Sequence, residues 1–379
     1  MKFYTSREKA LESLEIFVNK DIVNYSSKRN YDCGPIDRKN VSCLSPYITH
    51  RLIDEYEISK KILSKHPYQT VEKYIQEIYW RVYWKGWLEL RPKVWADFIE
   101  DLNIIEECKN YHQAINGQSK IECFNDWVKE IKEFNYLHNH TRMWFASIWI
   151  FTLGLPWQKG AEFFMKYLFD GDAASNTLSW RWVAGLQTKG KNYLAQSWNI
   201  NKFLNKKYQN IDLKENVPPL IDNREYKISP INIQESKSRS DYLIIFENDL
   251  SKNNLKIKNY KKIYFILLDN QQRSLKLDSK VLNYKKNIMK DQLKKIDDNL
   301  EFIDSNKIEE LLDNLKNVDI VYPSIGENMS FLSKKIEQKT LNINFITREE
   351  DLFCWNFSNK GYFNFKANIP KILAKFQLN

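Results

Sequence analysis

The spacing of apolar residues changes once along this 379-residue chain, and the change divides it into two kinds of structure. Over residues 6–206, apolar side chains recur every three or four positions, as at Leu11, Leu14 and Phe17. This period places apolar side chains on one face of a helix, and residues 70–90 repeat it. The sequence therefore predicts an all-helical domain over residues 1–206.

A different pattern follows residues 207–238, which contain Pro and Ser positions, show little periodicity and are predicted to form a surface linker. Beyond them, short apolar runs typical of buried strands alternate with helical patterns. The expected strands are 242–246, 263–268, 300–303, 318–322 and 341–346, and the expected helices are 281–296, 308–315 and 329–336. Repeated strand–helix units predict a Rossmann-like, doubly wound parallel α/β domain over residues 239–379.

Composition excludes several classes of protein. With 43% hydrophobic residues, 10 Gly and 10 Pro, the chain is neither collagen-like nor fully disordered. Its five cysteines form no CxxC pair and no cluster at metal-ligand spacing, which favours reduced thiols, no metal site and a cytoplasmic location. The longest uncharged apolar stretch, 143–157, is shorter than the roughly 20 residues that a bilayer requires. The net charge of +10 permits a polyanionic partner.

Several residues suggest a binding site in the helical domain. Eleven of the 12 tryptophans lie between Trp80 and Trp198, a density that packing alone explains poorly. The segment 170–176 has two carboxylates on a turn of small residues that leads into a helix, which predicts either a helix cap or a ligand site. Asn139 and Arg142 are three apart, so a helix would place an amide and a guanidinium on one face.

Taken in order, four separated blocks resemble the DNA photolyase/cryptochrome family. They are the segments 41–47 (VSCLSPY), 77–81 (EIYWR), 138–143 (HNHTRM) and 170–182 (DGDAASNTLSWRW), with Tyr25 upstream and Trp157 between the last two. The closing segment 361–365 and the strand–helix repeat are similar to the family's α/β antenna domain. That domain normally precedes the flavin domain, so the resemblance implies a circularly permuted order. Ser251 stands where the family usually has Arg after Asp-Leu.

The resemblance implies FAD as cofactor and leaves open a second, antenna chromophore of unidentified chemistry. The residues that would bind FAD are Tyr25, Val41, Ser42, Leu44, Ser45, Tyr74, Glu77, Arg81, Asn139, Arg142, Asp170, Asp172 and Asn176. Among these, Arg142 and Asp170 are expected to form a buried ion pair. Asn176 would face the flavin ring, where an amide adds no second negative charge to a reduced flavin.

The resemblance also implies light-driven repair of cyclobutane pyrimidine dimers. The residues that would contact a flipped dimer are Trp80, Arg81, Asn139, Met143 and Trp182, with Glu77 hydrogen-bonded to the lesion. Enzymes that repair (6–4) lesions place histidines where Asn139 and Met143 stand, which argues against that substrate. Trp180 and Trp157 match the two inner members of an electron-transfer chain, so the expected catalytic residues are Glu77, Asn176, Trp180 and Trp157. The third member is open among Trp84, Trp87, Trp95 and Trp127.

The expected partner is DNA containing pyrimidine dimers, single- or double-stranded, bound by a monomer. Basic residues flank the proposed pocket in the sequence and would contact phosphates: Arg81, Arg181, Lys189, Lys191, Lys202 and Lys206. The alternative is a cryptochrome-type photoreceptor, which would use the same flavin and tryptophans without repair. His138 and His140 are left open between a surface role and a site role.

Overall fold

The periodic apolar faces of the first 206 residues form the expected helices in a computed structural model, which describes residues 2–208, 210–231, 233, 240–251, 260–293, 299–338 and 342–378. Helix α1 (Arg7–Lys20) begins where the Ser6 side chain accepts a hydrogen bond from the Lys9 backbone N–H, and it buries Leu14 and Phe17 of the predicted apolar face. Helix α5 (Tyr68–Glu89) confirms the pattern seen at 70–90. The other elements of this half are η1 (Ile22–Asn24), α2 (Tyr25–Lys28), α3 (Ser45–Thr49), α4 (Glu55–Leu63), α6 (Lys93–Ile104), α7 (Lys109–Ile115), α8 (Glu122–Phe134), α9 (Asn139–Ser147), η2 (Ile148–Thr152), α10 (Trp157–Tyr167), α11 (Ala173–Val183) and α12 (Ser197–Phe203).

The later part of the chain forms a parallel five-stranded sheet in the order β3-β2-β1-β4-β5, which confirms the doubly wound topology. The strands are β1 (Tyr242–Phe246), β2 (Lys262–Ile266), β3 (Leu300–Ile303), β4 (Asn317–Val321) and β5 (Asn342–Ile346). The helices of this part are α13 (Ser279–Leu293), α14 (Ile308–Asn314) with η4 (Ser305–Lys307) before it, α15 (Glu327–Gln338), α16 (Glu349–Trp355), α17 (Tyr362–Ala367) and α18 (Ile369–Lys375). The end of the helix expected at 281–296 lies outside the described residues.

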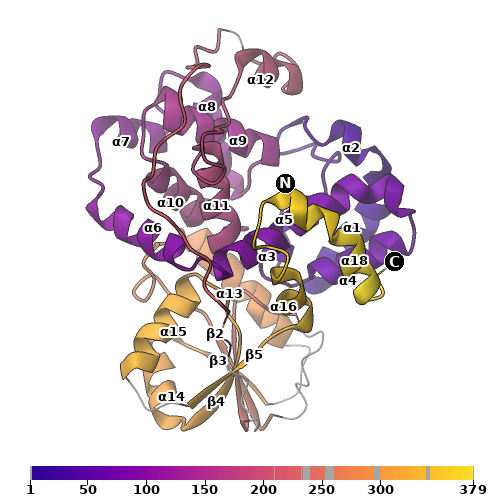
Figure 1. The fold of residues 1–379 in the computed structure, drawn as a ribbon, viewed down its shortest axis with the longest axis vertical. Helices are drawn as coiled ribbons and strands as arrows, with labels where there is room; N and C mark the ends of the chain where they lie inside the picture. The colour runs from indigo at the N-terminus through magenta and orange to yellow at the C-terminus, as the bar shows by residue number, and fades with distance from the viewer. Residues whose placement is uncertain are drawn as a thin grey trace.

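Both faces of the sheet are buried, as the continuous apolar runs predict. On β1, Ile244 and Phe246 face a cluster that includes residues of α14 and α15, whereas Leu243 and Ile245 belong to the core that continues into the helical half. Figure 1 shows this arrangement, with the sheet below the helical half. The α/β part is therefore packed directly against the helices.

The carboxyl end of the sheet lies at this junction. After β1, the Leu250 N–H donates to the His50 carbonyl oxygen, and the Ser251 hydroxyl donates to Asp54. Arg51 pairs with Asp249 at 3.0 Å. These contacts bury the segment that follows β1 against the loop between α3 and α4.

The last three helices, α16 to α18, pack beside α4 and α5 and not around the sheet (Figure 1). Arg51 donates two hydrogen bonds of 2.6 Å to Asp351 of α16 and joins that helix to the helical half. Tyr362 of α17 stacks on Trp80 of α5. The end of the chain thus supplies side chains to the same region as α5.

The segment expected to be a linker contains no helix or strand over its described residues 210–231. It crosses the surface of the helical half, where Leu220 donates to the Ala184 carbonyl oxygen and Ser229 to that of Leu90. Arg224 makes an ion pair of 2.8 Å with Asp101 of α6. The segment is therefore extended and fastened to helices along its length.

Candidate functional site

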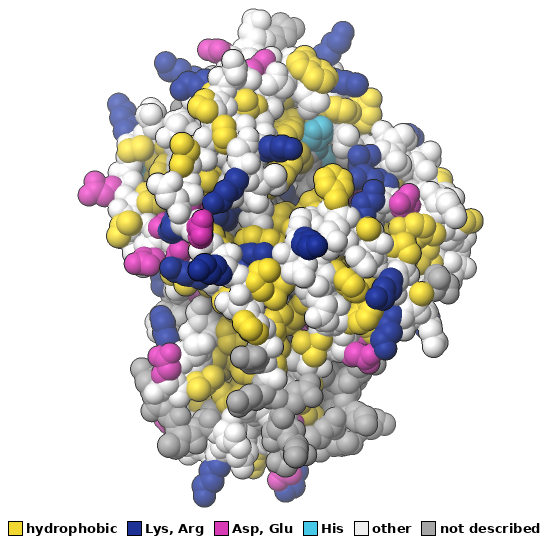
Figure 2. Space-filling view, in the orientation of Figure 1, with side chains coloured by type: hydrophobic (Ala, Val, Ile, Leu, Met, Phe, Trp, Pro, Cys, Tyr) yellow, Lys and Arg dark blue, Asp and Glu magenta, His cyan; other side chains and the backbone are white. Residues whose placement is uncertain are grey.

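A cavity of about 580 Å³ opens in the helical half and is lined by segments that are far apart in the sequence. The lining includes most of the residues singled out above: Tyr25, Val41, Ser42, Leu44, Ser45, Tyr74, Glu77, Trp80, Arg81, Asn139, Arg142, Met143, Asp170, Asn176, Trp180 and Trp182. Figure 2 shows Lys and Arg side chains around a hollow in this half, with a histidine at its edge. The fold thus brings the four sequence blocks to one site.

An ion pair anchors one wall of this cavity. The Arg142 guanidinium lies 2.8 Å from the Asp170 carboxylate, and the Ser45 hydroxyl donates to the same oxygen. Burial alone would raise the pKa of Asp170, but the positive charge and hydrogen bonds of Arg142 outweigh it and hold that pKa below its usual value. The structure confirms the predicted pair, with Asp170 as its buried member.

Helix α11 positions Asn176 and Trp180. Its first turn is capped by Asp172, whose carboxylate accepts a 2.8 Å hydrogen bond from the Ser175 N–H. Asp172 is not among the residues that line the cavity, and the cap is the role that the structure shows for it. Its contact with FAD stays a prediction. The Asn176 side-chain amide donates to the Ala161 carbonyl oxygen at 2.9 Å, which leaves its Oδ1 acceptor for a ligand.

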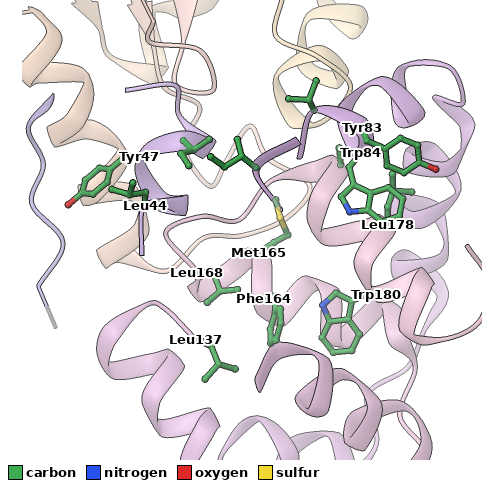
Figure 3. Packing of buried hydrophobic residues seen from close by; sticks show 14 of the residues in the cluster. Leu44, Tyr47, Tyr83, Trp84, Leu137, Phe164, Met165, Leu168, Leu178 and Trp180 are labelled. Atoms are coloured by element: carbon green, nitrogen blue, oxygen red, sulfur yellow. The ribbon is translucent and has the colours of Figure 1, made fainter. Parts of the chain in front are cut away.

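Apolar and aromatic side chains form much of the remaining wall. Figure 3 shows Phe164 and Trp180 next to one another, with ring centroids 5.1 Å apart. Leu44, Trp84 and Leu168 also line the cavity. Planar aromatic ligands favour such surroundings, because they bury apolar faces there.

Two tryptophans at the cavity are held by stacking on tyrosines. The Trp80 ring lies parallel to the Tyr362 ring with centroids 3.3 Å apart, and Trp182 stacks on Tyr193 at 5.7 Å. Glu77 also lines the cavity, and its carboxylate pairs with Lys73 at 2.9 Å, one turn earlier on α5. These contacts fix the orientation of both indole rings before any ligand binds.

The structure adds lining residues that the sequence left open or missed. His138 is 1% exposed, and its Nδ1 accepts from the His140 N–H, so burial lowers its pKa to about 4 and keeps the ring neutral. His140 packs on Trp144 with ring centroids 4.2 Å apart. Arg29 also lines the cavity. The only signal in the sequence for His138 and His140 was their position beside Asn139.

The basic residues expected to contact DNA divide into three groups. Arg81 lines the cavity, whereas Lys189, Lys191, Lys202 and Lys206 are exposed and do not. Arg181 is buried, and its guanidinium lies 3.4 Å from Asp222. The expectation that Arg181 contacts phosphate is therefore wrong, because its charge faces the interior and is already paired.

Trp157 is likewise not among the lining residues. It is 4% exposed and stacks on Phe98 with ring centroids 5.5 Å apart. Its place in an electron-transfer chain stays a prediction.

The cavity fits FAD on the chemistry of its lining. The described part of the chain supplies no hydrogen-bond partner to Asp170 Oδ1, His138 Nε2 or Arg81 Nη1, although all three atoms are buried. Buried polar groups are normally paired, so these atoms await a polar ligand. Cations suit a pyrophosphate, and the aromatic wall suits a flavin or adenine ring.

The described residues contain no group of three or more His, Cys, Asp or Glu side chains placed to hold a metal ion. None of their helices has the length and apolar composition needed to cross a membrane.

Comparison with known families gives a profile match to the "FAD binding domain of DNA photolyase" over residues 74–262, about half of the chain. The match covers α5 from Tyr74 onward and all of α9 and α11, which carry most of the cavity residues. Tyr25 and the segment 41–45 lie before it.

Curated relatives support the same family. The chain is 28% identical over 183 residues to the deoxyribodipyrimidine photo-lyase of Agrobacterium fabrum, covering 46% of this chain and 37% of the relative. It is 25% identical over 267 residues to that of Buchnera aphidicola subsp. Baizongia pistaciae, covering 62% of this chain and 55% of the relative. The chain thus spans about half the length, or less, of these relatives.

Solved structures give a weaker likeness. A bacterial class III photolyase from Agrobacterium tumefaciens aligns with a TM-score of 0.46 at 24% identity, covering 52% of this chain and 42% of that one. A cryptochrome from Synechocystis sp. PCC6803 aligns with a TM-score of 0.48 at 18% identity, covering 54% and 44%.

Proposed function

The chain belongs to the DNA photolyase/cryptochrome family, and from this premise we propose that it is a light-driven DNA-repair flavoprotein that splits cyclobutane pyrimidine dimers. The supporting observation is that one cavity combines two sets of residues. One set suits a dinucleotide cofactor, and the other suits two adjacent pyrimidines that have left the DNA helix. A circularly permuted domain order, with the α/β part after the helical part, belongs to the same proposal. A second, antenna chromophore stays a prediction.

At the cofactor end, the Arg142–Asp170 pair and Asn176 would hold FAD. Asp170 keeps an unpaired acceptor, and Asn176 keeps its Oδ1 acceptor, so both can bind ring or ribose donors. Arg81 and Arg29 bring positive charge to the same cavity, which suits the phosphates. Bound FAD would supply the light absorption and the one-electron chemistry.

At the substrate end, Trp80 and Trp182 would take the place of the stacking that a base loses when it leaves the DNA helix. Their rings are already oriented by Tyr362 and Tyr193. Glu77 and Asn139 would hydrogen-bond the edges of the pyrimidines, and Met143 would add an apolar contact. The aromatic wall would exclude water, so that the electron received by the lesion would not be lost to side reactions with water.

The test is a repair assay on a defined lesion. Protein loaded with FAD and reduced with dithionite is illuminated with oligothymidine that contains cyclobutane dimers, single-stranded and in a duplex. The expected result is the return of intact thymines, with Glu77→Gln losing a larger share of its repair rate than of its FAD content. FAD-loaded, reduced protein that repairs neither substrate would contradict the proposal and favour the cryptochrome-type photoreceptor.

A further inference from the structure

Three aromatic rings lead from the cavity wall toward the protein surface. Trp180 lines the cavity and meets Trp149 edge to face, with ring centroids 6.2 Å apart. Trp149 meets Tyr111 in the same manner at 6.0 Å. Trp149 is fully buried, and Tyr111 is partly exposed. Each ring in the series therefore contacts the next.

The absence of a side chain at Gly160 allows Trp180 and Trp149 to lie close together. A Cβ atom at this position of α10 would lie 2.2 Å from Trp180 Cη2 and 3.0 Å from Trp149 Nε1. Any side chain here would have to separate the two indoles. Trp149 lies in η2, a π-helical turn, and its indole N–H donates to the Pro156 carbonyl oxygen at 2.9 Å. π-helical turns are frequent at functional sites.

The surroundings of Tyr111 favour loss of an electron. Two carboxylates, Glu107 and Glu162, act on its phenol and, together with burial, raise its pKa, so the phenol keeps its proton at neutral pH. Lys159 lies 5.8 Å from the ring centroid and 3.2 Å from Glu162. Two negative charges and one positive charge leave a net negative charge near the ring, which stabilises the ring when it is oxidised. The partial exposure of Tyr111 allows the phenolic proton to leave.

The surroundings of Trp157 differ. The Arg181 guanidinium lies 5.8 Å from the centre of the Trp157 ring, and a cation at this distance stabilises the neutral indole over its radical cation. Asp222 pairs with Arg181 at 3.4 Å and offsets part of this effect. Trp149 contacts only aromatic rings among the ring–ring pairs of the described residues, and the cations that lie over Tyr111 and Trp157 have no counterpart over its ring.

We propose that Trp149 and Tyr111 carry electrons from the protein surface to Trp180, as a route that does not require Trp157. The inference rests on the proposed function, because it assumes that light-excited, oxidised FAD takes one electron from Trp180. The Trp180 radical cation then takes one electron from Trp149, and the Trp149 radical cation takes one from Tyr111. The phenolic proton of Tyr111 passes to water, and an added thiol returns one hydrogen atom to the tyrosyl radical.

The test detects the radical and not the repair. Protein with oxidised FAD, its content measured by absorbance, is illuminated without thiol, and the electron paramagnetic resonance spectrum is recorded. Ring-deuterated tyrosine identifies a tyrosyl signal. We expect that signal in the unaltered protein, in Trp157→Phe and in the control Tyr68→Phe. We expect its loss in Tyr111→Phe, which deletes only one hydroxyl, and in Trp149→Phe.

A tyrosyl signal that survives Tyr111→Phe, or that is lost in Trp157→Phe, would overturn the inference, as would its absence from the unaltered protein. Repair by dithionite-reduced, unaltered protein is measured separately, because chemical reduction bypasses the route. A protein that shows the Tyr111-dependent radical but repairs no dimer would count against the proposed repair and leave the electron route in place.

Discussion

At the cavity, the side chain of Asp170 depends on Arg142. The carboxylate is 1% exposed, and a charge at that depth is costly unless it is paired. Arg142 is in turn held by the Leu137 carbonyl oxygen, which its Nε contacts at 2.8 Å. The pair therefore has a structural role even before a cofactor binds.

Replacing Arg142 with Ala should lower the free energy of unfolding at pH 7 by about 3–5 kcal/mol, because it leaves a buried carboxylate unpaired. Arg142 lowers the folded pKa of Asp170, so this contribution is present above the usual Asp pKa of 3.8 and is lost as the pH falls through the folded value. Urea unfolding at pH 7 and at pH 3.5 should show a difference that shrinks in acid. Lys9→Ala, which removes an exposed pair with Glu12, is the control and should change little. A loss for Arg142→Ala equal to that of the control would contradict the expectation.

Single residues also show how far the sequence could predict the site. Arg142 and Asp170 were expected to pair because both belong to blocks with family-like spacing. The stacking of Tyr362 on Trp80 could not be expected, because the two residues lie far apart in the sequence and meet only through the packing of α17 on α5. The same holds for Trp149, which belongs to an ordinary apolar stretch in the sequence and lies beside Trp180 only through the packing of the helices.

Among the elements, α5 joins the cavity to the α/β part. It carries Tyr74, Glu77, Trp80 and Arg81 along the cavity and ends with the buried Glu89. Glu89 accepts two hydrogen bonds of 2.7 Å, from the Tyr322 hydroxyl and the Ile325 N–H, both in the chain that follows β4. Strands and helices such as these were predictable from local periodicity, whereas contacts between them depend on tertiary packing.

The pH dependence of stability in Glu89→Gln tests the contact of Glu89 with the chain that follows β4. Burial raises the pKa of Glu89 to about 7 from 4.5, so ionisation destabilises the folded state as the pH rises from 4.5 to 7. The full effect above pH 7 is about 3 kcal/mol. Chemical denaturation should show that the free energy of unfolding of the unaltered protein falls between pH 4.5 and 7 relative to that of Glu89→Gln. The control, Glu72→Gln on the exposed face of α5, should leave the pH profile of the unaltered protein unchanged. Parallel profiles for the unaltered protein and Glu89→Gln would show that Glu89 titrates normally.

The packing of α10 on α11 depends on Gly160. Gly160→Ala forces Trp180 to move, because the new Cβ would lie 2.2 Å from its ring, and overpacking of this kind costs about 1–3 kcal/mol. A lower melting temperature and a changed tryptophan fluorescence spectrum are expected. Gly361→Ala is the matched control, since nothing lies within 4 Å of its added Cβ. Equal effects of the two substitutions would mean that the ring tolerates displacement.

Across the whole molecule, the two halves are joined by a buried group of charges around Arg51. Its guanidinium contacts Asp249 after β1, Asp351 of α16 and Glu55 of α4, and the side chain is 2% exposed. The spacing of apolar residues predicted the elements of each half separately, but it contains no information on which charged residues meet between the two halves. This junction is the part of the fold that the sequence could not predict.

Arg51→Met should leave three carboxylates without this cation and lower the free energy of unfolding by about 3–5 kcal/mol. Because most tryptophans lie in the helical half, fluorescence follows that half while circular dichroism follows both. The two urea transitions should coincide in the unaltered protein and separate in the variant. Lys61→Met, which removes an exposed pair with Glu15, should leave them coincident. Coincident and unshifted transitions in Arg51→Met would show that the junction does not depend on this residue.

The binding of FAD in the cavity is tested most directly by titrating flavin-free protein with FAD and measuring the amount bound, for the unaltered protein and for Asp170→Ala. The unaltered protein should bind one FAD per chain, and Trp180 should quench the fluorescence of the bound flavin. Asp170→Ala, if circular dichroism shows that it is folded, should bind FAD at least about tenfold more weakly, as expected for the loss of one buried charged contact. A folded, unaltered protein that binds no FAD, or an Asp170→Ala variant that binds it equally well, would contradict this assignment of the cavity.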